Sequence, residues 1–302
     1  MPQAEANGLS IEYETFGDRA NPALLLIMGV GCQLIMWPED LCQGLADKGF
    51  FVIRYDNRDI GLTTKMDDAG APDIMAALTA QLSGEPVKAP YSLDDMADDA
   101  AALLKTLGID RAHIVGASMG GMIAQLVAIR HPEITKSLTS IMSTTGNPDL
   151  PAAKDEAMGA LLTPPADLSR DSLIAQGVTM WKVIGSPKYP ATEEELTTLA
   201  ARNVDRSICP EGFGRQVLAI LSAPARNEAL AKLSVPAMVL HGADDPLVPV
   251  EGGKDTAAAI PGARLEIIDG MAHDFTQALV PVYLDKIGGF VSEVESGRAA
   301  AE

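Results

Sequence analysis

The segment Gly116-Ala117-Ser118-Met119-Gly120 places a serine between two glycines in the pattern G-x-S-x-G. An apolar run at 113–115 precedes it, and a helical pattern at about 119–129 follows it. A sharp strand–turn–helix connection exposes the serine hydroxyl, and flanking glycines let neighbouring segments approach closely. The helix start directs free N–H groups toward a developing oxyanion. Ser118 is therefore the predicted nucleophile; the alternative is a glycine-rich turn with an incidental serine.

A serine nucleophile needs a general base, and the chain holds four histidines. His113 lies in the strand before the turn, where its side chain would point away from Ser118. His131 sits at a helix end and indicates a C-terminal cap, and His241 ends another expected strand, apart from the site. His273 follows the last expected strand, and loops beyond the carboxyl ends of strands hold the ligand sites of open α/β sheets. His273 is the predicted base, with a purely structural histidine as the alternative.

The acid that orients the base is expected in the loop at 241–249, which offers two candidates, Asp244 and Asp245. We prefer Asp245, with Asp244 as the alternative. The chosen carboxylate would accept a hydrogen bond from His273 and fix its tautomer. The three side chains would then carry out acyl transfer through a covalent serine intermediate.

An oxyanion needs two donors, and the N–H of Met119 at the helix start is the first candidate. The second is the N–H of Val30, in the small-residue segment Met28-Gly29-Val30-Gly31 after an early strand. A simple tight turn is the alternative for this segment. Gly29 and Trp181 are the predicted substrate contacts, although Trp181 could equally fill a helical core.

The hydrophobic pattern predicts the strands and helices that position these residues. Asn7-Gly8 predicts a hairpin turn before an alternating strand at 9–14. Continuous apolar runs indicate parallel strands buried on both faces, at 23–28, 50–53, 113–115, 138–142, 237–240 and 264–268. Helical patterns lie between them at 38–48, 93–107 and 119–129, the second preceded by the capping-box pair Ser92 and Asp95. Alternating strands and helices predict a doubly wound parallel sheet.

The stretch 144–232 interrupts this alternation with helix formers and prolines. Its helical segments are expected at 152–162, 173–184, 193–203 and 212–221. We interpret 144–232 as a helical lid inserted into a core made of 1–143 and 233–296, with 297–302 as a tail. A separate helical domain is the alternative, disfavoured because the strand pattern resumes at once.

The amino-acid composition limits which binding partners and which cellular compartment we expect. A net charge of −18 at pH 7 repels phosphate backbones, so nucleic-acid binding is not expected. Three cysteines without C-x-x-C spacing argue against a disulfide framework or zinc site and fit a reducing compartment. No basic, apolar leader and no bilayer-length apolar run is visible, so we expect a cytoplasmic protein with no membrane partner. No metal or cofactor is expected, and nothing in the sequence specifies an oligomeric state.

These stretches together resemble the α/β-hydrolase superfamily over roughly residues 9–143 and 232–290. The resemblance implies a mostly parallel eight-stranded sheet with helices on both faces and a catalytic order of serine, acid and histidine. It also favours Asp245, the aspartate directly before a proline, and implies that Asp56 and Arg58 mainly brace the active-site loops. Met28-Gly29, where many members carry His-Gly, with Trp37-Pro38 downstream, is similar to a subset that includes the aclacinomycin methylesterases.

The function implied is hydrolysis of a small-molecule carboxylic ester without a cofactor. A cofactor-free perhydrolase or haloperoxidase and a C–C bond hydrolase use the same triad and remain alternatives. A ligand receptor on a hydrolase scaffold is less favoured, because binding alone does not require Asp245 and His273. Dehalogenases and epoxide hydrolases attack with a carboxylate, which the serine at position 118 disfavours. Cys32, near the expected oxyanion loop, is not expected to be the nucleophile.

Overall fold

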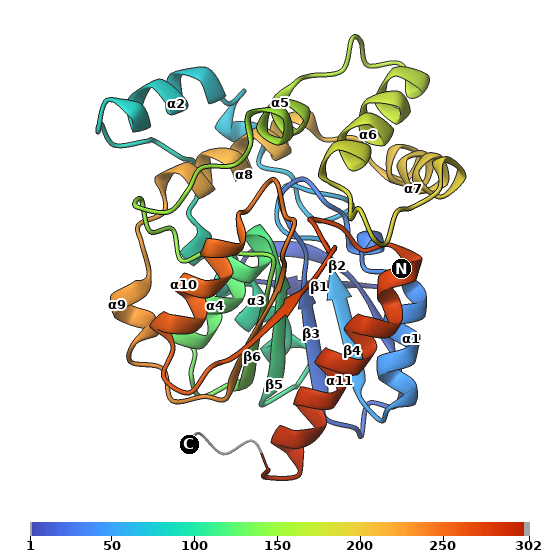
Figure 1. Ribbon diagram of the computed structural model, residues 1–302, viewed down its shortest axis with the longest axis vertical. Coiled ribbons are helices and arrows are strands. Elements are labelled where there is room, and N and C mark those ends of the chain that lie inside the picture. The colour runs from blue at the N-terminus through green and yellow to red at the C-terminus, as the bar shows by residue number, and fades with distance from the viewer. Residues whose placement is uncertain (1, 299–302) are drawn as a thin grey trace.

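An eight-stranded sheet forms the centre of the molecule, with a helix layer on each side and more helices above one end of the strands (Figure 1). The computed structural model describes residues 2–298. The spatial order of the strands is β1-β2-β4-β3-β5-β6-β7-β8. Pairing is antiparallel for β1–β2 and β2–β4 and parallel for the rest. The strands are β1 (Gln3–Ala6), β2 (Leu9–Phe16), β3 (Ala23–Ile27), β4 (Phe51–Tyr55), β5 (Ala112–Ala117), β6 (Thr135–Ile141), β7 (Ala237–Gly242) and β8 (Arg264–Ile268).

The mostly parallel α/β sheet predicted from the sequence is confirmed. The β1–β2 hairpin turns at Asn7 and Gly8, whose φ angles of 51° and 75° are those of a type I′ turn. Every residue of β3, β4 and β5 is buried, which explains their unbroken apolar patterns.

Two hydrophobic cores flank the sheet. Helices α3 (Leu93–Thr106) and α4 (Met119–Arg130) pack on one face, together with Leu25 and Ile114. Helices α1 (Glu39–Asp47) and α11 (Val280–Glu295) pack on the other face, with Leu26 and Val115. The expected capping box is present at the start of α3, where the Ser92 and Asp95 side chains each accept the other's backbone N–H. Helix α10 (Val250–Ala259) packs beside β7 and β8.

The insertion between β6 and β7 is helical throughout its regular elements. It contains α5 (Asp155–Leu162), α6 (Arg170–Ile184), α7 (Glu193–Arg206), α8 (Pro210–Ser222) and the short α9 (Asn227–Leu230). Figure 1 shows α5 to α8 above the carboxyl ends of the strands. The turn from β5 into α4, residues 116–120, lies at this end of the sheet and is called the elbow below. The predicted helical segments overlap α5 to α8, although α5 begins at Asp155, α6 begins at Arg170 and α7 continues to Arg206.

A further helix, α2 (Ile74–Leu82), joins the insertion from outside it and packs on α8. The sequence does not predict this helix, because its apolar residues lie on all sides and form no 3.6-residue stripe. Its one local signal is Asp73, whose side chain accepts the Ala76 N–H at the N-terminus. The helices above the strands therefore come from two parts of the chain, the insertion and the segment that carries α2.

Near the C-terminus, α11 ends at Glu295, and residues 299–302 of the predicted tail lie outside the described residues. Within residues 2–298, no helix combines the length and apolar character needed to cross a membrane.

The approach of α4 to β3 depends on the missing side chain of Gly120. A Cβ at this position would lie 2.1 Å from the carbonyl oxygen of Ile27, which is far inside van der Waals contact. We expect Gly120→Ala to lower the free energy of unfolding by about 1–3 kcal/mol, since backbone on both sides resists the shift. Gly159, in helix α5, has open space at its Cβ position. Gly159→Ala should instead raise stability by about 0.5–1 kcal/mol. Urea unfolding of both variants checks this, and equal stabilities would contradict the packing argument.

Candidate active site

Ser118 occupies a strained turn between β5 and α4. Its φ of 56° and ψ of −122° lie where non-glycine residues are rare and cost on the order of 1–3 kcal/mol. Bonds from β6 and the segment after it hold the turn: the Ser118 N–H donates to Ile141 at 2.9 Å, and the Ser143 hydroxyl donates to the Ser118 carbonyl at 2.7 Å. A Cβ at Gly116 would lie 1.9 Å from the carbonyl oxygen of Gly120. The glycines therefore make the turn possible, as the sequence pattern predicts.

Asp245 lies between the His273 ring and its own loop backbone. Its Oδ2 accepts a hydrogen bond from His273 Nδ1 at 2.7 Å. Its Oδ1 accepts the N–H groups of Leu247 at 2.9 Å and Val248 at 2.8 Å. The Asp245 side chain is fully buried, so these bonds fix its direction. Nδ1 is thereby committed to the carboxylate, and Nε2 is the nitrogen left to exchange a proton.

Asp244, the alternative acid, faces elsewhere. Its Oδ2 accepts the Gly270 N–H at 2.9 Å, at the start of the loop that carries His273. The structure thus brings Asp245 to the histidine and gives Asp244 a loop-bracing contact.

The loop carrying His273 is held by the end of α6 and the residues after it. The His273 N–H donates to the Ile184 carbonyl at 3.0 Å, and the Ala272 N–H donates to the Ser186 hydroxyl at 2.8 Å. Asp274 in turn accepts hydrogen bonds from the Ser186 N–H and hydroxyl. Burial raises the pKa of the Asp274 carboxyl, and its hydrogen bonds to Ser186 oppose that rise. No motif pointed to Ser186 or Asp274, because their pairing joins positions far apart in the chain.

The other histidines occupy different environments. His113 is fully buried against Ser137 and Glu295, and burial lowers its pKa to about 4. His131 caps the end of α4 and contacts Asp98, as the sequence suggested.

The expectation that His241 stands apart from the site is wrong. Its Nε2 lies 3.6 Å from Asp245 Oδ2 and bonds to the Val248 carbonyl at 2.8 Å. Burial lowers the pKa of His241, partly offset by the Asp245 charge. A neutral imidazole therefore packs beside the acid. The end of β7 and the turn after it bring positions 241 and 245 together, which periodicity alone does not reveal.

Ser118 and His273 line one apolar cavity of about 150 Å³ beneath the insertion. Both predicted substrate contacts, Gly29 and Trp181, line it as well. Position 29 faces the nucleophile, since a Cβ there would lie 3.1 Å from the Ser118 Cβ. Between the Ser118 hydroxyl and His273 there is no hydrogen bond among the described residues, and such bonds often tighten only when substrate binds.

The two predicted oxyanion donors lie at this cavity. Val30 is part of its lining, and Met119 directly follows the serine at the start of α4. Within residues 2–298, neither of their N–H groups donates a hydrogen bond to another protein group. Cys32 also lines the cavity, but burial raises the pKa of its thiol to about 12, which leaves little reactive thiolate at neutral pH.

A second, larger cavity of about 680 Å³ adjoins the first. Met36, Trp181 and Phe275 line both, so these side chains form the wall between them.

Comparison with known proteins assigns the chain to a family. A family model described as the alpha/beta hydrolase fold matches residues 22–276. The rhodomycin D methylesterase of a Streptomyces species is 29% identical over 286 residues, covering 86% of this chain and 87% of that protein. The 3-oxoadipate enol-lactonase 2 of Acinetobacter baylyi is 28% identical over 264 residues, covering 87% and 86%. The chain belongs to the α/β-hydrolase fold family.

Solved structures agree on the fold. A meta-cleavage product hydrolase from Pseudomonas fluorescens superposes with a TM-score of 0.73 at 19% identity, covering 98% of each chain. A thermophilic esterase from Thermogutta terrifontis superposes with a TM-score of 0.69 at 20% identity, covering 99% of each. The protein is thus a hydrolase of the α/β fold, in a family whose relatives here include a methylesterase and a lactonase.

The adjacent aspartates give a matched pair of variants. Asp245→Asn replaces the acceptor at His273 with a group that disfavours the required tautomer, and we expect kcat to fall about 10⁴-fold. Asp244→Asn keeps an oxygen for the Gly270 N–H and should change kcat by less than about threefold, since it touches no reacting group. Steady-state kinetics on an activated ester measure both. A larger loss in Asp244→Asn would reverse the assignment of the acid.

Proposed function

We propose that this hydrolase cleaves carboxylic esters through an acyl-enzyme intermediate on Ser118. One observation carries the proposal: the strained serine opens into the same cavity as His273, whose Nδ1 is held by buried Asp245. The similarity to a methylesterase at 29% identity supports ester cleavage over other acyl transfers.

In the proposed reaction, Ser118 Oγ attacks the ester carbon while its proton passes to His273 Nε2. Asp245 stabilises the imidazolium that forms. The N–H groups of Met119 and Val30 stabilise the oxyanion. Collapse of the tetrahedral intermediate breaks the C–O bond, and the alcohol leaves with the proton from His273. A water molecule then gives a proton to His273 and attacks the acyl carbon. As the bond to Ser118 Oγ breaks and the carboxylic acid is released, His273 returns the proton to Ser118 Oγ.

The cavity favours an uncharged group next to the reacting carbon. Among the described residues that line it, no lysine, arginine, aspartate or glutamate occurs. A carboxylate held there would lose its hydration without gaining a cationic partner, which is costly. This disfavours a carboxylate next to the reacting carbon, as in the dianion named for one relative, a 2-hydroxy-6-oxononadienedioate hydrolase. A neutral ester or lactone fits the lining better than an anionic C–C cleavage substrate.

Ser118 and Cys32 both line the cavity, and a pair of variants tests which of them is the nucleophile. We expect Ser118→Ala to lower kcat on para-nitrophenyl acetate by about 10⁴–10⁶-fold, because the acyl-enzyme cannot form. Cys32→Ala removes the neighbouring thiol and should keep kcat within about threefold. Retention of a tenth of the wild-type rate by pure Ser118→Ala protein would rule the serine out. One slow event per chain, without turnover, would instead indicate a receptor.

The wall between the two cavities can be tested by replacing Trp181. Trp181→Ala removes a side chain that lines both, and should open the 150 Å³ cavity toward the 680 Å³ one. We expect kcat/KM for long acyl esters to rise at least about tenfold relative to acetate, since each additional buried methylene contributes about 0.8 kcal/mol. Trp181→Phe keeps a ring in the wall and serves as the control. An unchanged chain-length profile in Trp181→Ala would contradict the role of this wall.

A further inference from the structure

Helix α8 of the insertion contacts the oxyanion loop, residues 29–34, through one buried amide. The Gly31 N–H donates to Gln216 Oε1 at 2.8 Å. Gln216 Nε2 donates to the Arg58 carbonyl at 2.9 Å, in the segment that follows β4. The Gln216 side chain is fully buried; its bond to the Arg58 carbonyl is shielded from water, and its bond from the Gly31 N–H is partly shielded. Because its nitrogen is anchored on the core, its oxygen has a fixed direction toward the loop.

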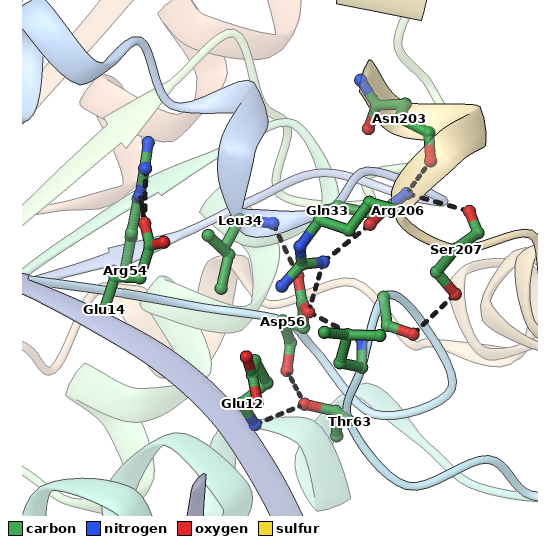
Figure 2. Close-up of polar contacts among 12 residues, drawn as sticks. Glu12, Glu14, Gln33, Leu34, Arg54, Asp56, Thr63, Asn203, Arg206 and Ser207 are labelled. Atoms are coloured by element: carbon green, nitrogen blue, oxygen red, sulfur yellow. Dashed lines mark hydrogen bonds and ion pairs between the residues drawn. The ribbon is translucent and has the colours of Figure 1, made fainter. Parts of the chain in front are cut away.

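A second set of contacts joins the same loop to the end of α7. Gln33 Nε2 donates to the carbonyls of Asn203 at 2.7 Å and Ser207 at 3.0 Å, the last turn of the helix and its C-cap. Figure 2 shows Arg206 between Gln33 and Asp56. It donates to Gln33 Oε1 at 2.6 Å and forms an ion pair with Asp56 at 2.7 Å.

Asp56 completes this connection on the core side. Its Oδ1 accepts the Leu34 N–H at 2.7 Å, and its Oδ2 accepts the Leu62 N–H at 2.8 Å. The bracing role that the family resemblance implies for Asp56 agrees with these contacts. The added finding is that the brace passes through Arg206, a residue of the insertion.

The fit of the loop between the serine and α8 leaves little freedom. On one side, Gly29 lies against the Ser118 Cβ. On the other, Gly31 has a φ of 68°, and a Cβ there would lie 2.6 Å from the Phe213 ring of α8. The Gly29–Val30 peptide, which carries the proposed oxyanion N–H, lies between these two contacts.

We propose that Gln216 and Arg206 of the insertion are positioning residues for the oxyanion loop. The insertion then contributes to the catalytic geometry as well as roofing the cavity. This inference rests on the proposed ester hydrolysis and extends it. Its physical basis is that an oxyanion donor is effective only when it is already aimed at the developing charge, and misplacement by about 1 Å costs on the order of 10²-fold in rate.

The test uses the whole chain with para-nitrophenyl acetate as substrate. The acetyl group is small, so its binding should depend little on the insertion above the cavity. Gln216→Met keeps the length of the side chain but removes both hydrogen bonds. We expect kcat to fall about 10- to 100-fold while KM changes less than about threefold, because the lost alignment acts in the transition state. Gln216→Glu keeps an oxygen acceptor for the Gly31 N–H and should recover part of the lost kcat.

Gln176→Met is the matched control. Gln176 is another glutamine of the insertion, and its amide donates to the carbonyls of Ala160 and Thr163, within the insertion itself. Among residues 2–298, its hydrogen bonds reach neither the oxyanion loop nor the loop of His273, so kcat should stay within about twofold. A comparable loss of kcat in this control would mean that the effect is general loosening of the insertion, and would overturn the proposal.

Inhibition by a transition-state analogue distinguishes a positioning role from a purely structural role. A short-chain trifluoromethyl ketone adds the Ser118 oxygen to its carbonyl carbon, and the proton goes to His273 while the carbonyl oxygen becomes an oxyanion. Its inhibition constant should rise in Gln216→Met by about the factor that kcat/KM falls. The inhibition constant of a non-reactive acetamide analogue should stay within about threefold.

Arg206→Met tests the second set of contacts and stands in if Gln216→Met does not fold. This variant should show the same fall in kcat and the same rise in the inhibition constant of the ketone. The proposal is overturned if folded Gln216→Met or Arg206→Met protein keeps kcat and the ketone inhibition constant within about twofold of wild type. Failure of the underlying function looks different, because the wild-type protein would then not turn over para-nitrophenyl acetate.

Discussion

The backbone of Ser118 is the constraint on which the site depends. A serine with φ of 56° is tolerated only where its surroundings compensate the strain. Here the compensation comes from Gly116 and Gly120, which let β5, α4 and β3 pass at distances that any side chain would block. Gly29 then places the oxyanion loop directly against the Ser118 Cβ. The elbow therefore determines where helix α4 starts and how near the oxyanion loop can lie.

The insertion contacts the loops on both sides of the site. The end of α6 contacts the loop of His273, and α7 and α8 contact the oxyanion loop. These contacts are buried or partly buried hydrogen bonds, each contributing about 1 kcal/mol net and costing more when one partner is lost. The insertion is thus connected to both sides of the cavity, which links its packing to the position of the reacting groups.

The features that depend on local sequence pattern could be predicted from the sequence. Apolar runs indicated the buried strands, and the glycines around Ser118 indicated the elbow, because each reflects chemistry within a few residues. Helix α2 escaped prediction because it has no apolar stripe and lies where no strand or motif marks it. The proximity of His241 to Asp245 escaped because the path of the turn after β7 decides it. Gln216 lies 185 positions from Gly31, and no local feature of either residue reveals that they meet.

Covalent trapping is the most direct measurement of the central claim, that Ser118 is the nucleophile of an acyl-transfer site. An alkyl fluorophosphonate forms a phosphorus–oxygen bond with an activated serine and releases fluoride. The account predicts one phosphonyl group per chain, carried by tryptic peptide 112–130, in which Ser118 is the sole serine and no cysteine occurs. Prior Asp245→Asn substitution should slow this labelling strongly. Labelling of peptide 20–48, which carries Cys32 and Cys42, or continued ester turnover in protein that takes up no label, would contradict it.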